Sequence, residues 1–225
     1  MLGGEVFVTS NQIRGRGQRG NTWVSEPDKN ITLSVILKPD FLLAREQFKL
    51  NMAVSLSIID FLNNYKKKQS TIKWPNDIYI GDQKIAGILI ENFLKKYNIE
   101  HAIIGIGLNV NQTYFNNLPA TSIAKETGKT YELSTLIEHL LECLESRFLM
   151  LKTGSFAQLK HQYISNLYRY QERHDFLDLK FNKGERFSGE ILGIDTLGKL
   201  AVLNHNSGSV HYFDFKEVQF LNNQT

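Results

Sequence analysis

The sequence predicts a mixed α/β domain followed by a small all-β domain, and two observations lead to this prediction. Up to residue 173, apolar runs with the period of strands alternate with runs that have the period of helices. Beyond residue 173, short apolar segments alternate with turns, as in small barrels. Four of these turns contain glycine: Gly184, Gly193, Gly198 and Gly208. We therefore expect one domain over 1–173 and a β-barrel of about 50 residues over 174–225.

Composition narrows the class of protein. The 225 residues are 42% hydrophobic and 22% charged, which is typical of a folded domain and excludes a disordered or fibrous chain. Lys and Arg (26) exceed Asp and Glu (23) by only 3, too few for a dedicated nucleic-acid binder. The single cysteine, Cys143, cannot form an internal disulfide and is interpreted as a packing residue in a reducing compartment. No apolar run approaches the roughly 20 residues that span a bilayer. We expect a cytoplasmic protein with neither DNA nor a membrane as partner.

Strands and helices of the first domain follow from local patterns. β-branched and apolar runs predict strands at 6–8, 31–37, 71–74, 77–80, 84–92 and 101–109. Apolar residues at helical spacing predict helices at 44–63, 134–151 and 156–168. We expect Ser134 to cap the second helix, Gly81 and Asp82 to form a hairpin turn, and residues 112–122 to form a loop.

A loop rich in glycine and arginine follows the first strand. Residues 15–20 read GRGQRG and match the dinucleotide-binding pattern GxGxxG. That pattern needs a helix to open inside it, whereas the next predicted element is the strand 31–37, so we exclude a Rossmann fold. Three glycines can turn backbone N–H groups inward, and Arg14, Arg16 and Arg19 add cationic donors, which favours binding of a phosphate or carboxylate. A solvated basic loop or an RNA-contacting tract are the alternatives that the loop alone leaves open.

A second unusual stretch lies at residues 73–77, which read KWPND. The proline favours a bend between two strands. Lys84 follows across the predicted hairpin, and we expect it to lie near Asp77. Glycines then interrupt the next two strands, at Gly87, Gly105 and Gly107. Because glycine weakens the middle of a strand, these positions indicate that another group approaches the backbone closely.

These motifs together resemble the ordered motif set of biotin–protein ligases. The resemblance rests on GRGQRG at 15–20 with Trp23, KWPND at 73–77, KIAGIL at 84–89 and GIGLN at 105–109. It covers nearly the whole chain. It implies an α+β fold with a mixed β-sheet flanked by helices, like class II aminoacyl-tRNA synthetases and the biotin–lipoate ligase catalytic domain. A small SH3-like β-barrel is implied after it.

The resemblance also implies an activity. Biotin and Mg-ATP would form biotinoyl-5′-adenylate and pyrophosphate, and a lysine of a biotin carboxyl carrier protein would then accept the biotin. This is the reaction of a biotin–[acetyl-CoA-carboxylase] ligase. Biotin and ATP are then substrates and Mg²⁺ the metal, with no tightly bound prosthetic group and no covalent enzyme intermediate. A homodimer is an assembly that the resemblance allows.

The resemblance also implies functional residues, at the positions of this sequence that match the family's motifs. Arg16 and Lys84 are the implied catalytic residues. Biotin would be bound by Gln12, Gly15, Arg16, Lys84, Gly87 and Gly105. ATP and the adenylate would be bound by Arg14, Gly17, Gln18, Arg19, Trp23, Asn76, Asp77 and Asn109. Asp77 is also the implied ligand of Mg²⁺, and the loop 112–122 is expected to order over the adenylate.

The sequence departs from the family at two places. Gln18 stands where some members carry arginine, which removes a charge near the phosphate. Members usually have a strand, a Ser-Thr-Asn motif and a helix before the segment that begins here at Glu5. We therefore expect an N-terminally truncated version that also lacks a helix-turn-helix domain, with an uncovered sheet edge and an open biotin pocket. The alternatives are a lipoate–protein ligase and a catalytically impaired relative that binds the carrier protein.

We expect Arg16→Ala to abolish formation of the adenylate, because the substitution removes a cationic donor from between two mutually repelling anions. Biotin-dependent exchange between ATP and pyrophosphate measures this step. Near-normal exchange in the variant would contradict the assignment.

Overall fold

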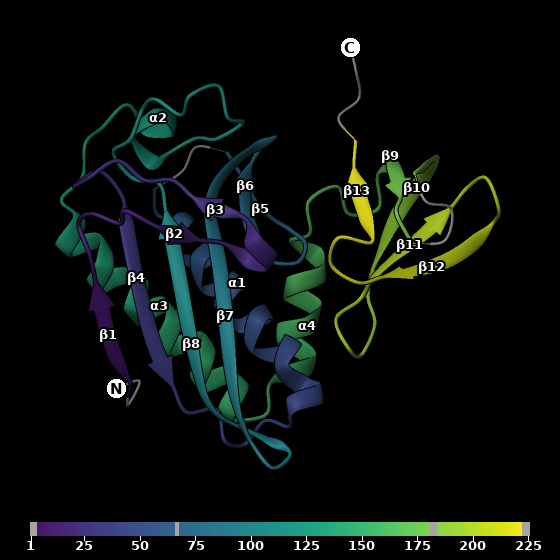
Figure 1. The fold of residues 1–225 in the computed structure, drawn as a ribbon, viewed down its shortest axis with the longest axis horizontal. Helices are drawn as coiled ribbons and strands as arrows, with labels where there is room; N and C mark the ends of the chain where they lie inside the picture. Colours follow the sequence, from purple (N-terminus) through teal and green to yellow (C-terminus); the bar gives the residue numbers. More distant parts are fainter. Residues whose placement is uncertain (1–3, 66–67, 181–183, 222–225) are drawn as a thin grey trace. The chain divides into compact units, whose positions relative to one another are not determined.

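A computed structural model describes residues 4–65, 68–180 and 184–221. The chain forms two compact units, Met1–Tyr163 and Ile164–Thr225. The first unit contains a six-stranded sheet in the order β1-β4-β8-β7-β6-β5 (Figure 1), and its neighbouring strands are antiparallel. The strands are β1 (Glu5–Val8), β4 (Ile31–Leu37), β5 (Ser70–Lys73), β6 (Asp77–Ile80), β7 (Gln83–Lys95) and β8 (Asn98–Leu108). An isolated parallel bridge joins Lys84 to Ala120.

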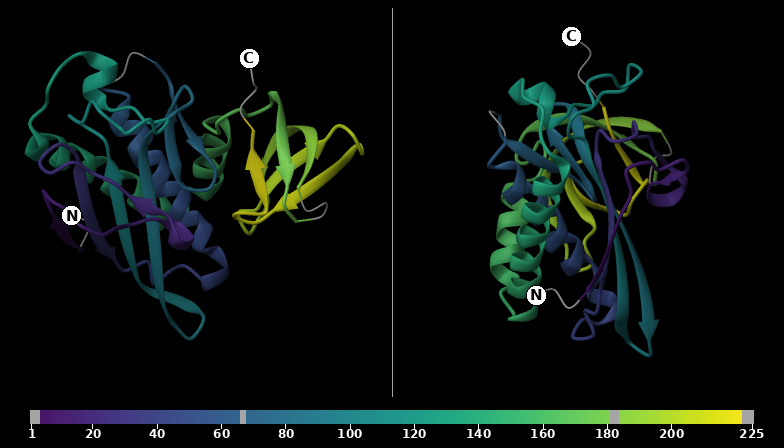
Figure 2. Two further views of the ribbon diagram at one scale, coloured as in Figure 1. Left: turned by 45° about the horizontal axis from the view of Figure 1, so that its top comes forward. Right: turned by 90° about the vertical axis from the view of Figure 1, so that its left-hand side faces the viewer.

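Helices α1 (Gln47–Leu62), which continues the 3-10 turn η2 (Ala44–Glu46), and α3 (Leu133–Lys152) cover one face of this sheet (Figure 2). The chain also forms the helices α2 (Ile123–Thr127) and α4 (Phe156–Ser165). The right panel of Figure 2 shows α1 and α3 on one side of the sheet and the N-terminal segment on the other. None of the helices in the described ranges is long and apolar enough to cross a membrane.

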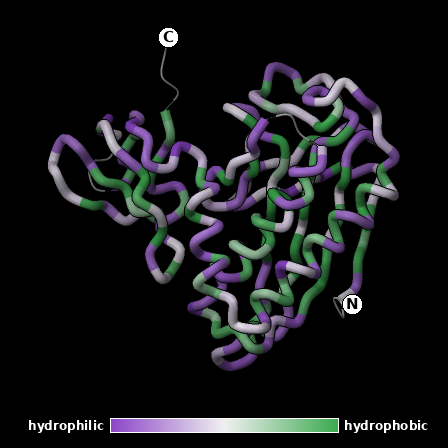
Figure 3. Tube along the Cα trace, turned by 180° about the vertical axis from the view of Figure 1, so that it is seen from behind, coloured by the Kyte–Doolittle hydropathy of each residue, from purple (hydrophilic) through white to green (hydrophobic). Residues whose placement is uncertain are grey.

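Alternate strand residues form the core beneath the helices. Figure 3 shows hydrophobic stretches along the central strands. The strand residues that face the helices are at most 3% exposed: Leu33, Val35, Ile72, Ile78, Ile88, Ile104 and Ile106. Helix α1 packs against α3 and against β5, β6 and β7, and most of its residues are buried, as its wide apolar stripe predicts. The predicted domain of sheet and helices is confirmed.

A short hairpin occupies the other face of the sheet. It consists of β2 (Gly15–Arg16), the 3-10 turn η1 (Gln18–Gly20) and β3 (Thr22–Trp23). No α-helix opens within GRGQRG, so the structure agrees with the exclusion of a Rossmann fold.

Several boundaries differ from the prediction. Strands β7 and β8 extend beyond the predicted ends at residues 92 and 101 to a tight turn, with Lys95 paired to Asn98 and Lys96 at a φ of 55°. The predicted N-cap Ser134 is wrong, since α3 begins at Leu133 after Glu132. Helix α2 was not predicted. Its five residues are too few for a helical period to be recognised, and its capping residue is Ser122, whose hydroxyl accepts the N–H of Lys125.

The second unit is an antiparallel sheet in the order β12-β11-β10-β9-β13, which confirms the predicted small all-β domain. Its strands are β9 (Arg173–Asp178), β10 (Glu185–Ile194), β11 (Leu200–Asn204), β12 (Ser209–Phe213) and β13 (Val218–Phe220). Phe187 stacks on Phe176 and Phe213 in its core. Gly193 was predicted in a turn, but it lies at a bulge in β10 with a φ of 134°. The domain limits 1–173 and 174–225 stay a prediction. Strand β9 begins at Arg173, one residue before the predicted start of the second domain.

A partly buried ion pair joins three helices of the first unit. Arg147 on α3 is only 9% exposed, and its Nε and Nη2 donate to the Asp60 carboxylate on α1 at 2.5 and 2.7 Å. Its Nη1 donates to Gln162 on α4. The Asp60 side chain is 33% exposed, so water partly solvates the carboxylate, and the pair contributes mainly through its two charge-assisted hydrogen bonds.

We expect Arg147→Met to lower the free energy of unfolding by about 2 kcal/mol, because it removes the charge-assisted hydrogen bonds to Asp60. Urea denaturation followed by circular dichroism of the helices measures this change. Lys95→Ala, which breaks the exposed pair of Lys95 with Glu100, is the control and should leave the midpoint almost unchanged. Equal midpoints for the two variants would show that the pair of Arg147 with Asp60 contributes little.

Candidate functional site

Two glycines form a flat floor on the face of the sheet opposite the helices. Gly87 on β7 and Gly107 on β8 are directly paired. The indole of Trp23, carried by β3, lies on them: a Cβ atom at Gly107 would overlap its ring, and one at Gly87 would lie 3.4 Å from its Cζ3. The absence of side chains at both positions therefore allows an aromatic ring to rest on the backbone. This is the close approach that the sequence predicted.

A lysine–aspartate ion pair borders this floor. Asp77 on β6 is paired with Gly87 in the register of the sheet. The Nζ of Lys84 lies 2.7 Å from the Oδ1 of Asp77 and 5.7 Å from the centre of the Trp23 ring. The two charged side chains are 31% and 28% exposed, so a ligand can reach them. The structure thus brings together Trp23, Asp77, Lys84 and Gly87 as predicted site residues.

A β-bulge turns Lys84 toward the floor. Residues three apart in a regular strand point to opposite faces, which would place Lys84 and Gly87 on different sides of the sheet. Here Ala86 pairs with Ile78 and Lys84 pairs with Tyr79, so β7 holds the additional residue Ile85. The bulge reverses the alternation. The Lys84 amine consequently lies only 3.2 Å from where a Gly87 Cβ would be.

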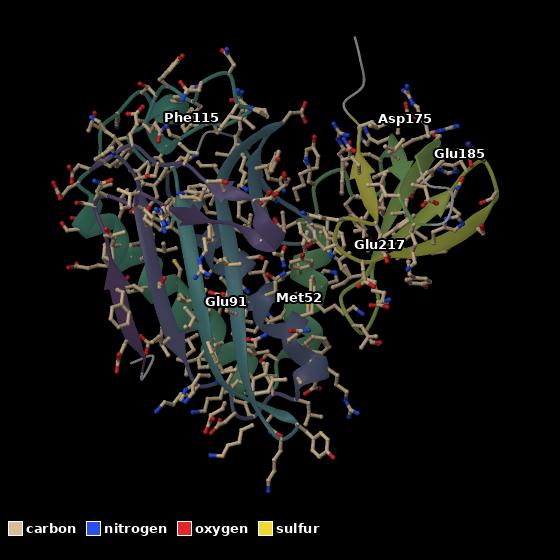
Figure 4. All side chains as sticks on the ribbon, viewed as in Figure 1. Met52, Glu91, Phe115, Asp175, Glu185 and Glu217 are labelled. Atoms are coloured by element: carbon tan, nitrogen blue, oxygen red, sulfur yellow. The ribbon has the colours of Figure 1, made fainter. Side chains whose placement is uncertain are left out.

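The glycine-arginine loop lies above the same face, but its Arg16 contacts a different carboxylate from that of the ion pair. The Nη2 of Arg16 is 3.7 Å from the Oε2 of Glu91, farther along β7 (Figure 4), and the Arg16 side chain is 77% exposed. Arg14 is exposed, and the side chain of Arg19 lies outside the described part of the structure. The N–H of Gly17 donates to Asn21 within the loop.

At the start of this loop, Gln12 contacts Gly15. A Cβ atom at Gly15 would lie 2.8 Å from the Oε1 of Gln12 and would overlap the carbonyl of Trp23. Gly105 is the remaining glycine of the predicted biotin pocket. A Cβ atom there would lie 3.6 Å from the carbonyl oxygen of Leu89, which is an ordinary van der Waals contact. The proposed contacts of Gln12, Gly15 and Gly105 with biotin stay predictions.

Asn76 and Asn109 are buried and bind protein backbone. Asn76 is 8% exposed and its Nδ2 donates to the carbonyl of Ile88 at 2.5 Å. Asn109 is 3% exposed and its Nδ2 donates to the carbonyl of Thr121 at 3.0 Å. Both amides therefore hold the framework around the ion pair, and direct contact of either with a nucleotide stays a prediction.

Three polar atoms near the site are buried and have no hydrogen-bond partner among the described residues. They are the Nε1 of Trp23, the Oε1 of Gln18 and the Oδ1 of Asn109. Leaving such a group unsatisfied costs about 1–3 kcal/mol, so each of these atoms would gain from a polar ligand or a water molecule. They offer one donor and two acceptors.

The sequence analysis assigned no role to Lys73 and Tyr79, which lie beside Asp77 and Lys84 on the same face of the sheet. Lys73 is paired with Asp77, and Tyr79 with Lys84, so all four side chains share one face. The Nζ of Lys73 donates to the hydroxyl of Tyr79 at 3.3 Å and lies 4.7 Å above its ring. Burial, and then the negative charge of Asp77, raise the pKa of Tyr79 to about 12, which keeps it neutral. The period-2 alternation from Asp77 was the signal that could have found them.

The structure of Cys143 agrees with its interpretation as a packing residue. Burial, and then the negative charge of Asp60, raise the pKa of Cys143 to about 11, so its thiol stays protonated near neutral pH. Its Sγ lies 3.7 Å from the Nε2 of His139. Over the described residues, no three His, Cys, Asp or Glu side chains gather in a way that could hold a metal ion by themselves.

Comparison with known proteins identifies relatives of the chain. Residues 3–109 match the Biotin/lipoate A/B protein ligase family. The bifunctional ligase/repressor BirA of Bacillus subtilis is 32% identical over 216 residues, which cover 91% of this chain. The biotin–[acetyl-CoA-carboxylase] ligase of Paracoccus denitrificans is 28% identical, covering 76% of this chain and 74% of the relative. The chain spans only 63% of the length of the Bacillus relative.

The fold has close counterparts among solved structures. The biotin protein ligase from Aquifex aeolicus, in a complex with biotin and ATP, superposes with a TM-score of 0.78. The two proteins are 24% identical, and the match covers 96% of this chain and 89% of the other. At this identity the comparison shows that the fold is shared.

We expect Gly107→Ala to displace the Trp23 ring, because the new methyl group would overlap it. Intrinsic fluorescence measures this displacement: the emission of Trp23 should shift to the red, while the buried Trp74 provides a constant background. Gly105→Ala is the matched control on the same strand, since its methyl group meets only ordinary contacts. Identical spectra for the two variants would contradict the arrangement.

Proposed function

We propose that the chain is a biotin–protein ligase, which activates biotin with ATP and transfers the biotin to a lysine of a biotin carboxyl carrier protein. The match of residues 3–109 to the Biotin/lipoate A/B protein ligase family supports the reaction class. The substrates follow from relatives named as biotin ligases and from the Aquifex protein bound to biotin and ATP.

One observation of this structure carries the proposal: a lysine amine, paired with a carboxylate, faces an aromatic ring that rests on two glycines. An aromatic face can stack against a base or pack against an apolar ring system. An amine beside it can neutralise an anion. A carboxylate and a nucleotide bound at the two ends of such a surface would therefore meet at Lys84.

The first step joins two anions. A carboxylate oxygen of biotin attacks the α-phosphorus of ATP, the bond from that phosphorus to the bridging oxygen breaks, and pyrophosphate leaves. Lys84 is proposed to lie between the carboxylate and the α-phosphate and to stabilise the negative charge that they share. Because it already stands 2.7 Å from Asp77, its amine is held in place before substrate arrives.

The second step transfers biotin to the carrier protein. The neutral amine of the acceptor lysine attacks the carbonyl carbon of the adenylate, the bond to the phosphate oxygen breaks, and AMP leaves while the amine loses a proton. No side chain of the enzyme needs to form a covalent bond.

Asp77 is the residue that we propose for Mg²⁺. Mg²⁺ in nucleotide sites is held by one or two carboxylates together with substrate phosphates, and Asp77 offers one accessible carboxylate beside the floor. The ion would neutralise phosphate charge when bound. Among the described residues there is no carboxylate cage, so the phosphates would have to supply most of its ligands.

Arg16 is proposed to complete the site by moving. Its contact with Glu91 is 3.7 Å long and exposed, and exposed ion pairs contribute at most about 1 kcal/mol. Substrate phosphate can therefore draw Arg16 away at little cost. The glycines on either side allow the backbone to follow.

We expect the wild-type chain to catalyse exchange of labelled pyrophosphate into ATP when biotin is present, and to label a carrier domain with biotin in a streptavidin blot. Lys84→Ala should reduce the exchange rate about 100-fold or more, because it removes the charge between the two anions. Lys95→Ala, on the exposed hairpin, is the control and should retain the wild-type rate.

Exchange that responds to lipoate rather than biotin would favour a lipoate–protein ligase. Binding of the carrier domain with no exchange on either acid would favour the non-catalytic alternative. Either result would overturn the proposal.

A further inference from the structure

The main chain of Lys84 is held by the loop that precedes α2. Its N–H donates to the carbonyl of Pro119 at 2.9 Å, and its carbonyl accepts the N–H of Thr121 at 2.9 Å. The parallel bridge between Lys84 and Ala120 results from these two bonds. At its bulge, β7 thus takes the loop as a neighbour, and the position of Lys84 depends on where the loop lies.

Asn109 fixes this loop to the end of β8. Its Nδ2 donates to the carbonyl of Thr121 at 3.0 Å, and its carbonyl accepts the N–H of Ile123 at 3.2 Å. Its own N–H donates to Ile85, the bulged residue, at 2.9 Å. Asn109 therefore holds the bulge and the loop together through one residue.

The side chain of Thr121 provides the remaining attachment. It is completely buried, and its hydroxyl donates to the Oε1 of Glu126 on α2 at 2.7 Å. Charge-assisted bonds of this kind are among the stronger hydrogen bonds in proteins. The bond lies in the first turn after the loop, so it sets how close α2 holds Thr121 to Lys84.

We propose that Thr121 and Glu126 are positioning residues that hold Lys84 in its working orientation. Neither side chain needs to touch substrate. A shift of about 1 Å in a group that acts on the reacting atoms can cost about 100-fold in rate. Removing the hydroxyl of Thr121 frees Glu126 from the loop and lets the main chain of Lys84 move. For its activity measurements, this inference rests on the proposed ligase function.

The central experiment compares Thr121→Val with Thr127→Val. Valine keeps the shape of threonine. Within the described ranges, the Thr127 hydroxyl donates to the carbonyl of Ile123 and accepts the N–H of Lys129, both in its own segment. We expect Thr121→Val to lower kcat of biotin-dependent exchange about 10- to 100-fold with little change in the KM for biotin, as for other supporting residues. Thr121→Ser, which keeps the hydroxyl, should restore the rate, and Thr127→Val should match the wild type.

A double-mutant cycle separates positioning from general damage. If Thr121 acts through Lys84, Thr121→Val should have no further effect in the Lys84→Ala background. An equal loss in both backgrounds would overturn the proposal. Should Thr121→Val fail to fold, Glu126→Ala against Glu126→Gln makes the same comparison, because glutamine retains an acceptor oxygen.

A readout without substrate distinguishes failure of this inference from failure of the proposed function. The protein, reductively methylated with carbon-13, gives a resonance for each lysine amine, and the Lys84 resonance is the one that Lys84→Ala removes. We expect this resonance to shift in Thr121→Val and not in Thr127→Val. An unchanged resonance would overturn the positioning role, whereas absence of exchange in the wild type would overturn only the ligase function.

Discussion

At Ile85, strand β7 carries one residue more than the strand beside it, and the charged part of the candidate site depends on that residue. Without it, Lys84 would point toward the helices, where alternate strand residues form a closed apolar core. With it, the lysine amine reaches Asp77 and the Trp23 ring. Bulges commonly re-aim a side chain near functional sites. This one is maintained by hydrogen bonds from Asn109 and from the loop before α2.

The two faces of the sheet have different roles: one packs against the helices, and the other carries the candidate site. The helical face is apolar and closely packed, and the ion pair of Arg147 with Asp60 joins its helices. The opposite face carries Gly87, Gly107, Asp77 and Lys84, and Trp23 of the short hairpin lies on it. Glycine at positions 87 and 107 weakens the strands locally, and the strength of the helical face compensates for it. A rigid sheet can thereby carry a surface that is open to ligands.

The sequence allowed most of the fold to be predicted, because strands and helices with a buried face leave a clear period, as in the strand 31–37. The small helix α2 and the cap of α3 were missed, since short elements and their ends depend on tertiary contacts. Within the site, the proximity of Lys84 to Asp77 followed from the hairpin. The bulge could not be predicted, because local sequence does not show where a strand gains a residue. The position of Arg16 beside Glu91 also depends on a long-range contact.

A crystal structure with a non-hydrolysable analogue of biotinoyl-adenylate tests the central claim most directly. The account predicts that the analogue lies on the Trp23 side of the sheet and that the Lys84 amine lies about 3 Å from an oxygen at the junction of its acyl and phosphoryl groups. Trp23 should still rest on Gly87 and Gly107. An analogue bound away from this floor, or a Lys84 amine that still contacts only Asp77, would contradict it.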